Sequence, residues 1–353
     1  METLKQFSLK PETIPASTAW YIADLAEARG RQKLYTRQVP QRLKALREHA
    51  LIESAVSSNR IEGIEIDQKR VGTIIFGKPL LHDRDEEEVC GYREALNLIH
   101  QDAARIPISI RTILKLHRII RGEIWDAGKY KEKDGDIIEK YRDGRERTRF
   151  KTVPVSDTPV YMEKLVFLWG RTLKEKWVHP LVALAAFNLD FLCIHPFRDG
   201  NGRVSRLLFL LQCYHLGYEV GRYISLERLI EQNKERYYET LEQSSQGWHK
   251  SKHDPWPYIN YLMFILKTGY REFESRLDIT ESPRGAKTEI IEAAIKSCPN
   301  EFTLAGLERA CPGVSHDMIR KVLRAKQQNG DVACLGRGPG ARWAKRGNTL
   351  KRG

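Results

Sequence analysis

Residues 179–217, "HPLVALAAFNLDFLCIHPFRDGNGRVSRLLFLLQCYHLG", decide the fold, because two apolar segments flank one short charged loop. The first segment predicts a buried helix that begins near His179 and Pro180. Pro196 ends this helix, since proline has no amide proton and disfavours a helical residue before it. The second segment predicts a helix that begins near Gly202. The sequence therefore places His195 at the mouth of a loop between two core helices.

The loop residues have the chemistry of a phosphate site. The segment from Asp199 to Gly202 precedes a helix, where free N–H groups and the positive end of the helix dipole favour an anion. The glycines let a phosphate approach the backbone closely. Arg203 and Arg206 lie three apart on the same helix face, so both guanidinium groups can reach one phosphate chain.

Two side chains of this loop supply the remaining catalytic functions. Asp199 is a hard oxygen ligand that suits Mg²⁺ bridging phosphates. His195 is left as a base for an incoming hydroxyl. Each residue alone would fit an ordinary turn between core helices, but a turn requires neither the acid nor two spaced arginines. The set predicts a phosphoryl or nucleotidyl transfer site.

The composition predicts a soluble protein of two or three globular units. The chain has 353 residues, of which 41% are hydrophobic, enough for a sizeable core. Its six cysteines are scattered without a C-x-x-C pair, and no signal peptide precedes them. The most apolar region is interrupted by Asn188 and Asp190, so no stretch of about 20 residues could span a bilayer. We expect a reduced, cytoplasmic protein without membrane segments.

Helical periodicity dominates the chain, so we predict a mainly α fold. The exception lies between Gly128 and Pro154, where two short β-capable runs flank Asp143 and Gly144, a strong hairpin signal. A break at Ser282, Pro283 and Gly285 predicts a linker.

The C-terminal segment predicts a separate basic module. The chain carries a net charge of +13, and the residues from Arg284 onward contain 14 basic and 6 acidic residues. This segment predicts three helices, the last with Ser315 as its N-cap, and then a glycine-rich hairpin. The pattern is typical of a winged helix-turn-helix, with basic residues on the recognition helix and wing at Arg320, Lys321, Arg324, Lys326, Arg337 and Arg342. Binding of DNA and contact with another protein are equally open interpretations.

The stretch "HPFRDGNGRVSR" resembles the signature of the Fic (filamentation induced by cAMP) family, H-P-F-x-[DE]-G-N-G-R-x-x-R, at every fixed position. The resemblance covers about Asp85 to Tyr270. It implies transfer of AMP from ATP to a Tyr, Ser or Thr hydroxyl of a protein, with release of pyrophosphate. Related Doc toxins, which transfer the γ-phosphate, carry a lysine where Gly202 stands here, so this glycine favours AMP transfer.

The resemblance also implies a role for each signature residue. His195 would deprotonate the target, and Asp199 would hold Mg²⁺ at the α- and β-phosphates. The anion hole and the sites for the β- and γ-phosphates would comprise Gly200, Asn201, Gly202, Arg203 and Arg206. The hairpin resembles the family's flap, which aligns the target by strand addition, although an ordinary surface hairpin fits as well.

Two further segments resemble regulatory and binding elements of the family. "SSNRIEG" contains Ser58, Glu62 and Gly63 in the inhibitory-helix pattern [ST]-x-x-x-E-[GN]. In autoinhibited relatives this glutamate pairs with the second signature arginine, here Arg206, and excludes the γ-phosphate. In the segment that resembles the adenine-pocket wall, the candidates are Asn233, Tyr237 and Tyr238, although an aromatic pair is also common in cores.

These inferences give five regions and two classes of function. We assign 1–84 to an N-terminal helical region with the inhibitory helix, 85–275 to the Fic domain, 276–285 to a linker, 286–345 to the winged helix-turn-helix and 346–353 to a basic tail. The expected partners are a protein target, the chain itself as a target, DNA and a second copy of the chain. The alternatives to AMP transfer are a DNA-binding regulator whose Fic domain senses nucleotide, removal of AMP, and transfer of another phosphate-linked group.

Overall fold

The computed structural model confirms the mainly α fold. It describes residues 2–9, 13–38, 40–67, 70–71, 74, 81, 83–140, 145–278, 288, 291–292, 294–295, 298–311, 314–336 and 341–346. The chain forms two compact units, Met1–Leu34 with Arg47–Arg271 and Tyr35–Leu46 with Glu272–Gly353. No described helix is long and apolar enough to cross a membrane. All six cysteines are free thiols.

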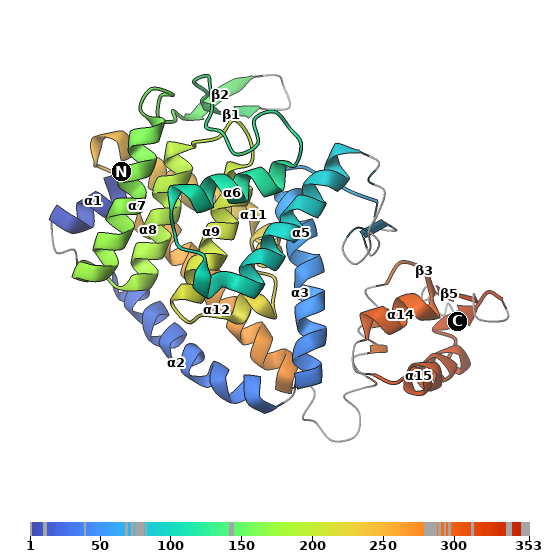
Figure 1. Ribbon diagram of the computed structural model, residues 1–353. Coiled ribbons are helices and arrows are strands. Elements are labelled where there is room, and N and C mark those ends of the chain that lie inside the picture. The colour runs from blue at the N-terminus through green and yellow to red at the C-terminus, as the bar shows by residue number, and fades with distance from the viewer. Residues whose placement is uncertain are drawn as a thin grey trace. The chain divides into compact units, whose positions relative to one another are not determined.

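The helices up to residue 278 surround two buried central helices, α8 (Pro180–Ile194) and α9 (Asn201–His215) (Figure 1). In chain order they are α1 (Glu2–Leu9), α2 (Ala16–Gln38), α3 (Pro40–Ile61), α5 (Arg84–Asp102), α6 (Ile110–Arg121), α7 (Thr158–Glu175), α8 (Pro180–Ile194), α9 (Asn201–His215), α10 (Leu226–Gln232), α11 (Lys234–Ser245) and α12 (Trp256–Asp278). Helix α8 packs against α7, α9 and α1, and every residue from Leu181 to Ile194 is buried. Helix α8 is therefore the hydrophobic centre on which the neighbouring helices pack.

The two core helices end and begin as the sequence pattern requires. His195 forms the C-cap of α8 in the left-handed region, with φ 52° and ψ 62°, and its N–H donates to Phe191 O at 3.0 Å. Gly200 is the N-cap of α9 and has φ 84°, a conformation that favours glycine. Helix α9 begins at Asn201, one residue before the predicted start. The loop between the two helices has six residues, His195 to Gly200, and both of its end residues have left-handed conformations.

The N-terminal helix belongs to the same packed body. The amide groups of Thr3 and Leu4 donate to the carboxylate of Asp190 in α8, each at 3.1 Å. The indole of Trp248 donates to the same carboxylate at 2.7 Å. Since Asp190 is fully buried, these bonds satisfy a charge that would otherwise be costly inside the core.

The predicted hairpin is present as strands β1 (Ile137–Lys140) and β2 (Glu146–Phe150), which pair antiparallel with Ile138 opposite Thr148. The turn predicted at Asp143 and Gly144 lies outside the described residues. The hairpin lies at the same end of the helical body as the loop that holds His195 (Figure 1).

The C-terminal unit contains β3 (Glu301–Thr303), α14 (Leu304–Ala310), α15 (His316–Gln328), β4 (Val332–Cys334) and β5 (Arg342–Lys345). The strands form an antiparallel sheet in the order β3-β5-β4. Leu307, Ile319 and Leu323 lie in its own hydrophobic core. Ser315 caps α15, since its side chain accepts from Met318 N–H at 3.4 Å. The last two of the three predicted helices, α14 and α15, are present, and so are the two strands that follow them, β4 and β5. The first predicted helix is described only in part, and most of the predicted linker lies outside the described residues.

Candidate active site

His195 is held at the wall of a pocket in a neutral state. Burial lowers the pKa of its imidazole to about 4, and the nearby Lys131 cation acts in the same direction. The ring is therefore unprotonated at neutral pH and can accept a proton.

The loop after His195 is fixed by side chains that bond to its backbone. Asn201 accepts from Phe197 N–H at 2.9 Å and donates to Phe197 O at 2.8 Å. From α6, His117 accepts from Gly128 N–H at Nδ1, 2.9 Å away, so its Nε2 carries the proton donated to Asp199 O at 3.0 Å. The His117 ring also stacks on Phe197, with centroids 3.8 Å apart. The sequence pattern did not identify His117, which lies 82 residues before the loop residue it binds.

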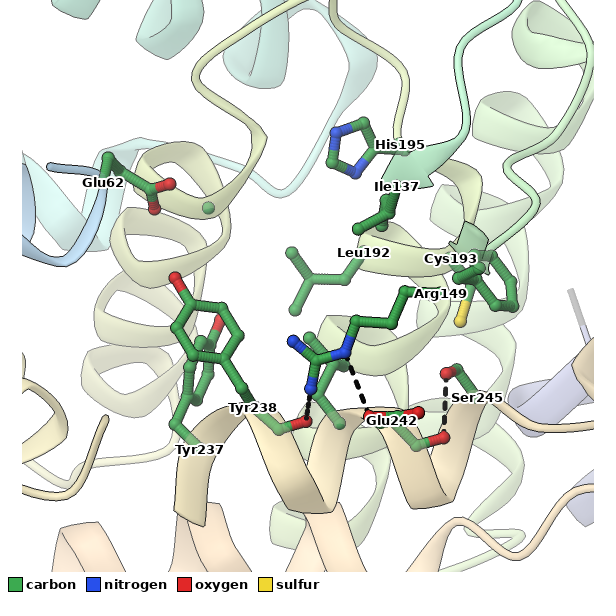
Figure 2. Close-up of a pocket in the computed structure, with 13 residues that line it drawn as sticks. Glu62, Ile137, Arg149, Leu192, Cys193, His195, Tyr237, Tyr238, Glu242 and Ser245 are labelled. Atoms are coloured by element: carbon green, nitrogen blue, oxygen red, sulfur yellow. Dashed lines mark hydrogen bonds and ion pairs between the residues drawn. The ribbon is translucent and has the colours of Figure 1, made fainter. Parts of the chain in front are cut away.

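The pocket beside His195 has a volume of about 250 Å³ and is bounded by the hairpin, by helices α8, α9 and α11, and by the end of α3 (Figure 2). Glu62 and Gly202 lie at one end, and the walls are Ile137, Arg149, Phe150, Leu192, Cys193, Tyr237, Tyr238, Leu241, Glu242 and Ser245. The predicted pair Tyr237 and Tyr238 thus faces the pocket. Asn233 is not among its lining residues, and its amide nitrogen instead donates to Leu229 O at 2.8 Å. Apolar walls with a few polar groups suit a flat aromatic base.

The hairpin is joined to this pocket by a carboxylate on α11. Arg147 donates to Glu242 Oε1 at 2.6 Å, and Arg149 donates to Glu242 Oε2 at 3.0 Å. Figure 2 shows Arg149 extended toward Tyr238 and Glu242, and its second bond goes to Tyr238 O at 2.9 Å. Both arginines therefore reach the same carboxylate, although the strand register shifts between Thr148 and Phe150. Their partner Glu242 was not identified from the sequence.

Arg206 is held by the end of α3. Its Nη2 donates to Glu62 Oε1 at 2.8 Å and to Ser58 O at 2.9 Å, while its Nε donates to Ser58 Oγ at 2.9 Å. The ion pair predicted between Glu62 and Arg206 is thus present. The remaining nitrogen, Nη1, is buried and has no hydrogen-bond partner among the described residues. This nitrogen can therefore donate to another acceptor.

Gly63 sets the position of Glu62. Gly63 has φ 83° and donates its N–H to Arg60 O, and Ile64 N–H donates to Asn59 O, each at 3.0 Å. These two bonds form a Schellman motif, which ends α3 at Ile61 and places Glu62 directly after the helix. Gly202 is equally constrained, because a Cβ there would overlap Glu62 Oε1 and lie 3.1 Å from Arg206 Nη1.

Arg203 has a buried partner that the sequence pattern did not identify. The prediction grouped it with Arg206 on a phosphate chain, but its side chain is fully buried and forms an ion pair with Glu88. It also donates to Asn59 Oδ1 at 3.2 Å. Glu88 accepts as well from Arg84 at 2.8 Å and from Arg121 at 3.0 Å. In this structure Arg203 supports the loop and is not among the residues that line the pocket.

Asp199 is an ionised, partly exposed carboxylate. Burial alone would raise its pKa, but Arg203 and Arg121 lower it. Its Oδ2 accepts from Arg121 at 2.7 Å and from Arg84 at 3.4 Å, and its side chain is 45% exposed. No cluster of three His, Cys, Asp or Glu side chains that could hold a metal occurs in the described part of the chain. One exposed carboxylate fits Mg²⁺, which commonly takes its other ligands from phosphates and water.

Residues 107–213 match the sequence model of the Fic/DOC family. A curated relative from Nematostella vectensis named Protein adenylyltransferase Fic is 26% identical over 231 residues, which are 62% of this chain and 47% of the relative. The protein of the same name from Drosophila melanogaster is 25% identical over 232 residues, 62% of this chain and 41% of the relative. The matches thus cover less than half the length of these curated relatives.

Solved structures share the fold. A Fic family protein from Desulfovibrio desulfuricans superimposes with a TM-score of 0.60 at 23% identity, covering 96% of this chain and 98% of that chain. Fic-1 from C. elegans superimposes with a TM-score of 0.58 at 19% identity, covering 75% of this chain and 74% of that chain.

Proposed function

Because the chain belongs to the Fic/DOC family, we propose that it is a protein adenylyltransferase. It moves AMP from ATP to a Tyr, Ser or Thr hydroxyl of a protein and releases pyrophosphate. The observation that carries the proposal is the buried, unpartnered Nη1 of Arg206 in the second turn of α9. This nitrogen lies beside Gly202, which lines the same pocket as the neutral His195. A phosphate oxygen would satisfy that nitrogen.

In the proposed reaction, the target hydroxyl oxygen forms a bond to the α-phosphorus of ATP. The bond between the α-phosphorus and the bridging oxygen breaks, and pyrophosphate leaves with that electron pair. His195 takes the hydroxyl proton, which its low pKa allows because the ring is neutral at physiological pH. The free N–H groups at the first turn of α9 hold the α-phosphate.

The other groups bind and orient the nucleotide. The adenine base of ATP lies between the hairpin and α11, against Tyr238 and Leu241. Asp199 is the residue that would hold Mg²⁺, which supplies positive charge against the departing pyrophosphate. Arg121 and Arg84 donate to this carboxylate, keep it ionised and fix its position.

Glu62 restrains the enzyme in this proposal. The guanidinium nitrogen of Arg206 that donates to Glu62 cannot at the same time bind a γ-phosphate. ATP then binds weakly or with its α-phosphorus out of line for attack. Displacement of Glu62 by a partner or by a second copy of the chain would relieve the restraint.

A paired labelling assay tests the function. The wild type, Glu62→Gly and Glu62→Gly/His195→Ala proteins each receive Mg²⁺ and ATP labelled at the α- or the γ-phosphate. We expect protein label from the α position only, raised by Glu62→Gly and abolished by His195→Ala. Label from the γ position would show a kinase instead. Incubation with AMP-modified protein would reveal AMP removal, and tight ATP binding without any label would favour the nucleotide-sensing regulator.

The C-terminal unit carries a second proposal, that it is a winged helix-turn-helix that binds DNA. The support is the exposed row Arg320, Lys321 and Arg324 on α15. Lys326, which the sequence pattern included in this set, forms ion pairs with Glu292 at 3.0 Å and Asp331 at 3.2 Å. In the wing, Arg342 lies 3.7 Å from Glu301, and Arg337 lies outside the described residues.

Fluorescence anisotropy of the full chain with duplex DNA at several salt concentrations tests this second proposal. Arg320→Ala/Arg324→Ala should weaken binding and flatten its salt dependence, because phosphate contacts release counterions. Arg309→Ala on the neighbouring α14 is the matched control. Equal binding by both variants would point to protein contacts as the role of this unit.

A further inference from the structure

Lys131 bonds to the backbone on both sides of His195. Its N–H donates to Pro196 O at 2.9 Å, and its Nζ lies 3.4 Å from Ile194 O. The Lys131 side chain is buried, and Nζ also donates to Thr152 Oγ1 at 2.8 Å. These contacts attach the catalytic loop to the segments that lead into and out of the hairpin.

The bonds to Lys131 matter because His195 has an unfavourable backbone conformation. Its φ of 52° and ψ of 62° lie in the left-handed region, which a residue with a Cβ rarely adopts. Such a conformation persists only where its surroundings over-determine it. Lys131 holds the carbonyl before His195 and the carbonyl after it, so both ends of the histidine backbone are fixed.

Lys131 also shapes the electrostatics of the imidazole. Its ammonium opposes protonation of His195, whereas Glu62 at the end of α3 and Asp199 in the loop favour it. Burial lowers the pKa of Lys131 to about 8, with Asp134 and Asp136 acting against this shift, so the ammonium stays largely protonated at neutral pH.

His195 and Lys131 share a second cavity of about 330 Å³, which lies apart from the pocket beside Tyr238. His195 lines both cavities. The other charged residues of the second cavity are of mixed sign, namely Glu132, Lys133, Asp134, Asp136 and Arg198. Among these charged groups, Lys131 is the one that bonds to the backbone around His195.

We propose that Lys131 is a positioning residue for His195, which fixes the backbone of the catalytic histidine and places a positive charge beside its imidazole. The inference rests on the proposed function, in which His195 is the base. The two parts of the role are separable, since the hydrogen bonds set geometry and the charge sets protonation.

The test compares Lys131→Met and Lys131→Arg, both in the full chain with Glu62→Gly. Lys131→Met keeps an unbranched side chain and the backbone N–H bond to Pro196 O, but it removes the charge and the Nζ donor to Ile194 O and Thr152 Oγ1. Lys131→Arg keeps the charge. We expect Lys131→Met to lower kcat by about 10- to 100-fold with KM for ATP little changed. The acid limb of its pH–rate profile should move to higher pH but stay below the ordinary imidazole pKa of about 6.5, because burial, the main cause of the low pKa, is unchanged. The acid limb of Lys131→Arg should stay low. Lys129→Met, an exposed lysine of the same segment, is the control.

A second readout does not depend on turnover. An NMR titration of the histidine ring protons, with the His195 signal assigned by His195→Ala, gives the imidazole pKa directly. A chain that folds but transfers no AMP would refute the proposed function, and the titration would still test Lys131. The inference is overturned if Lys131→Met leaves the imidazole pKa and kcat at the Lys129→Met values, or if it lowers activity only in proportion to lost folded protein.

Discussion

Replacement of Glu62 should release the enzyme, and the contacts give the size of the effect. Arg206 is almost wholly buried, Glu62 is 29% exposed, and one bond of 2.8 Å joins them. A hydrogen bond between charged groups in such a site contributes roughly 1.5–3 kcal/mol. Ser58 keeps its two bonds to Arg206, so the guanidinium stays in place when the carboxylate is removed. We therefore expect Glu62→Gly to raise AMP transfer at low ATP about 10- to 100-fold.

The assay measures initial rates with α-labelled ATP and ATP affinity by calorimetry. Glu62→Gln keeps an acceptor but loses the charge, so its rate should lie between those of the wild type and Glu62→Gly. Glu65→Gly makes the same chemical change at an exposed site three residues away and should have no effect. The reasoning is wrong if Glu62→Gly activates no more than Glu65→Gly, or if Glu62→Gln activates as much as Glu62→Gly.

Three further results follow from the same geometry. Gly202→Ala should activate the wild type, because the added methyl group would overlap Glu62 Oε1. The same substitution should not activate Glu62→Gly. Activation in both backgrounds would refute the steric explanation. In the active Glu62→Gly protein, kcat/KM should be constant from about pH 5.5 to 7.5, because the pKa of His195 is about 4 and its protonation begins well below this range. An inflection near pH 6.5 would contradict the lowered pKa of His195. Glu88→Gln removes the buried counter-charge of Arg203, which keeps only a 3.5 Å contact with Asp199, whereas Arg121 keeps its 2.7 Å bond to Asp199. The free energy of unfolding in urea should fall by about 3–5 kcal/mol, and a loss below about 1 kcal/mol would refute the role of this carboxylate.

The features predictable from the sequence are those set by local spacing. Pro196 fixes the end of α8, and Gly200 supplies the positive φ that α9 needs at its N-cap. Ser58 and Glu62 are four residues apart, so both lie on one face near the end of α3, and both contact Arg206.

The features that the sequence did not reveal depend on pairs brought together by folding. Arg203 and Glu88 are 115 residues apart, and Arg149 and Glu242 are 93 apart. The chain has 59 Lys and Arg and 46 Asp and Glu, so spacing alone cannot select one pair from so many. The sequence predicted that Arg203 and Arg206 bind one phosphate chain, because both lie on α9. In the structure the guanidinium of Arg203 forms an ion pair with the buried carboxylate of Glu88.

In the proposed function, the unequal burial of the contacts would allow a rigid site to be regulated. Buried groups hold the catalytic loop, including Asn201, His117 and the Arg203–Glu88 pair, and disrupting them would cost core stability. The restraint is different, because it ends on one partly exposed carboxylate directly before the glycine that terminates α3. A partner that prefers the released state by about 2 kcal/mol would shift the balance roughly 30-fold. Such a partner needs only to move the last turn of α3, and the loop that carries His195 can remain unchanged.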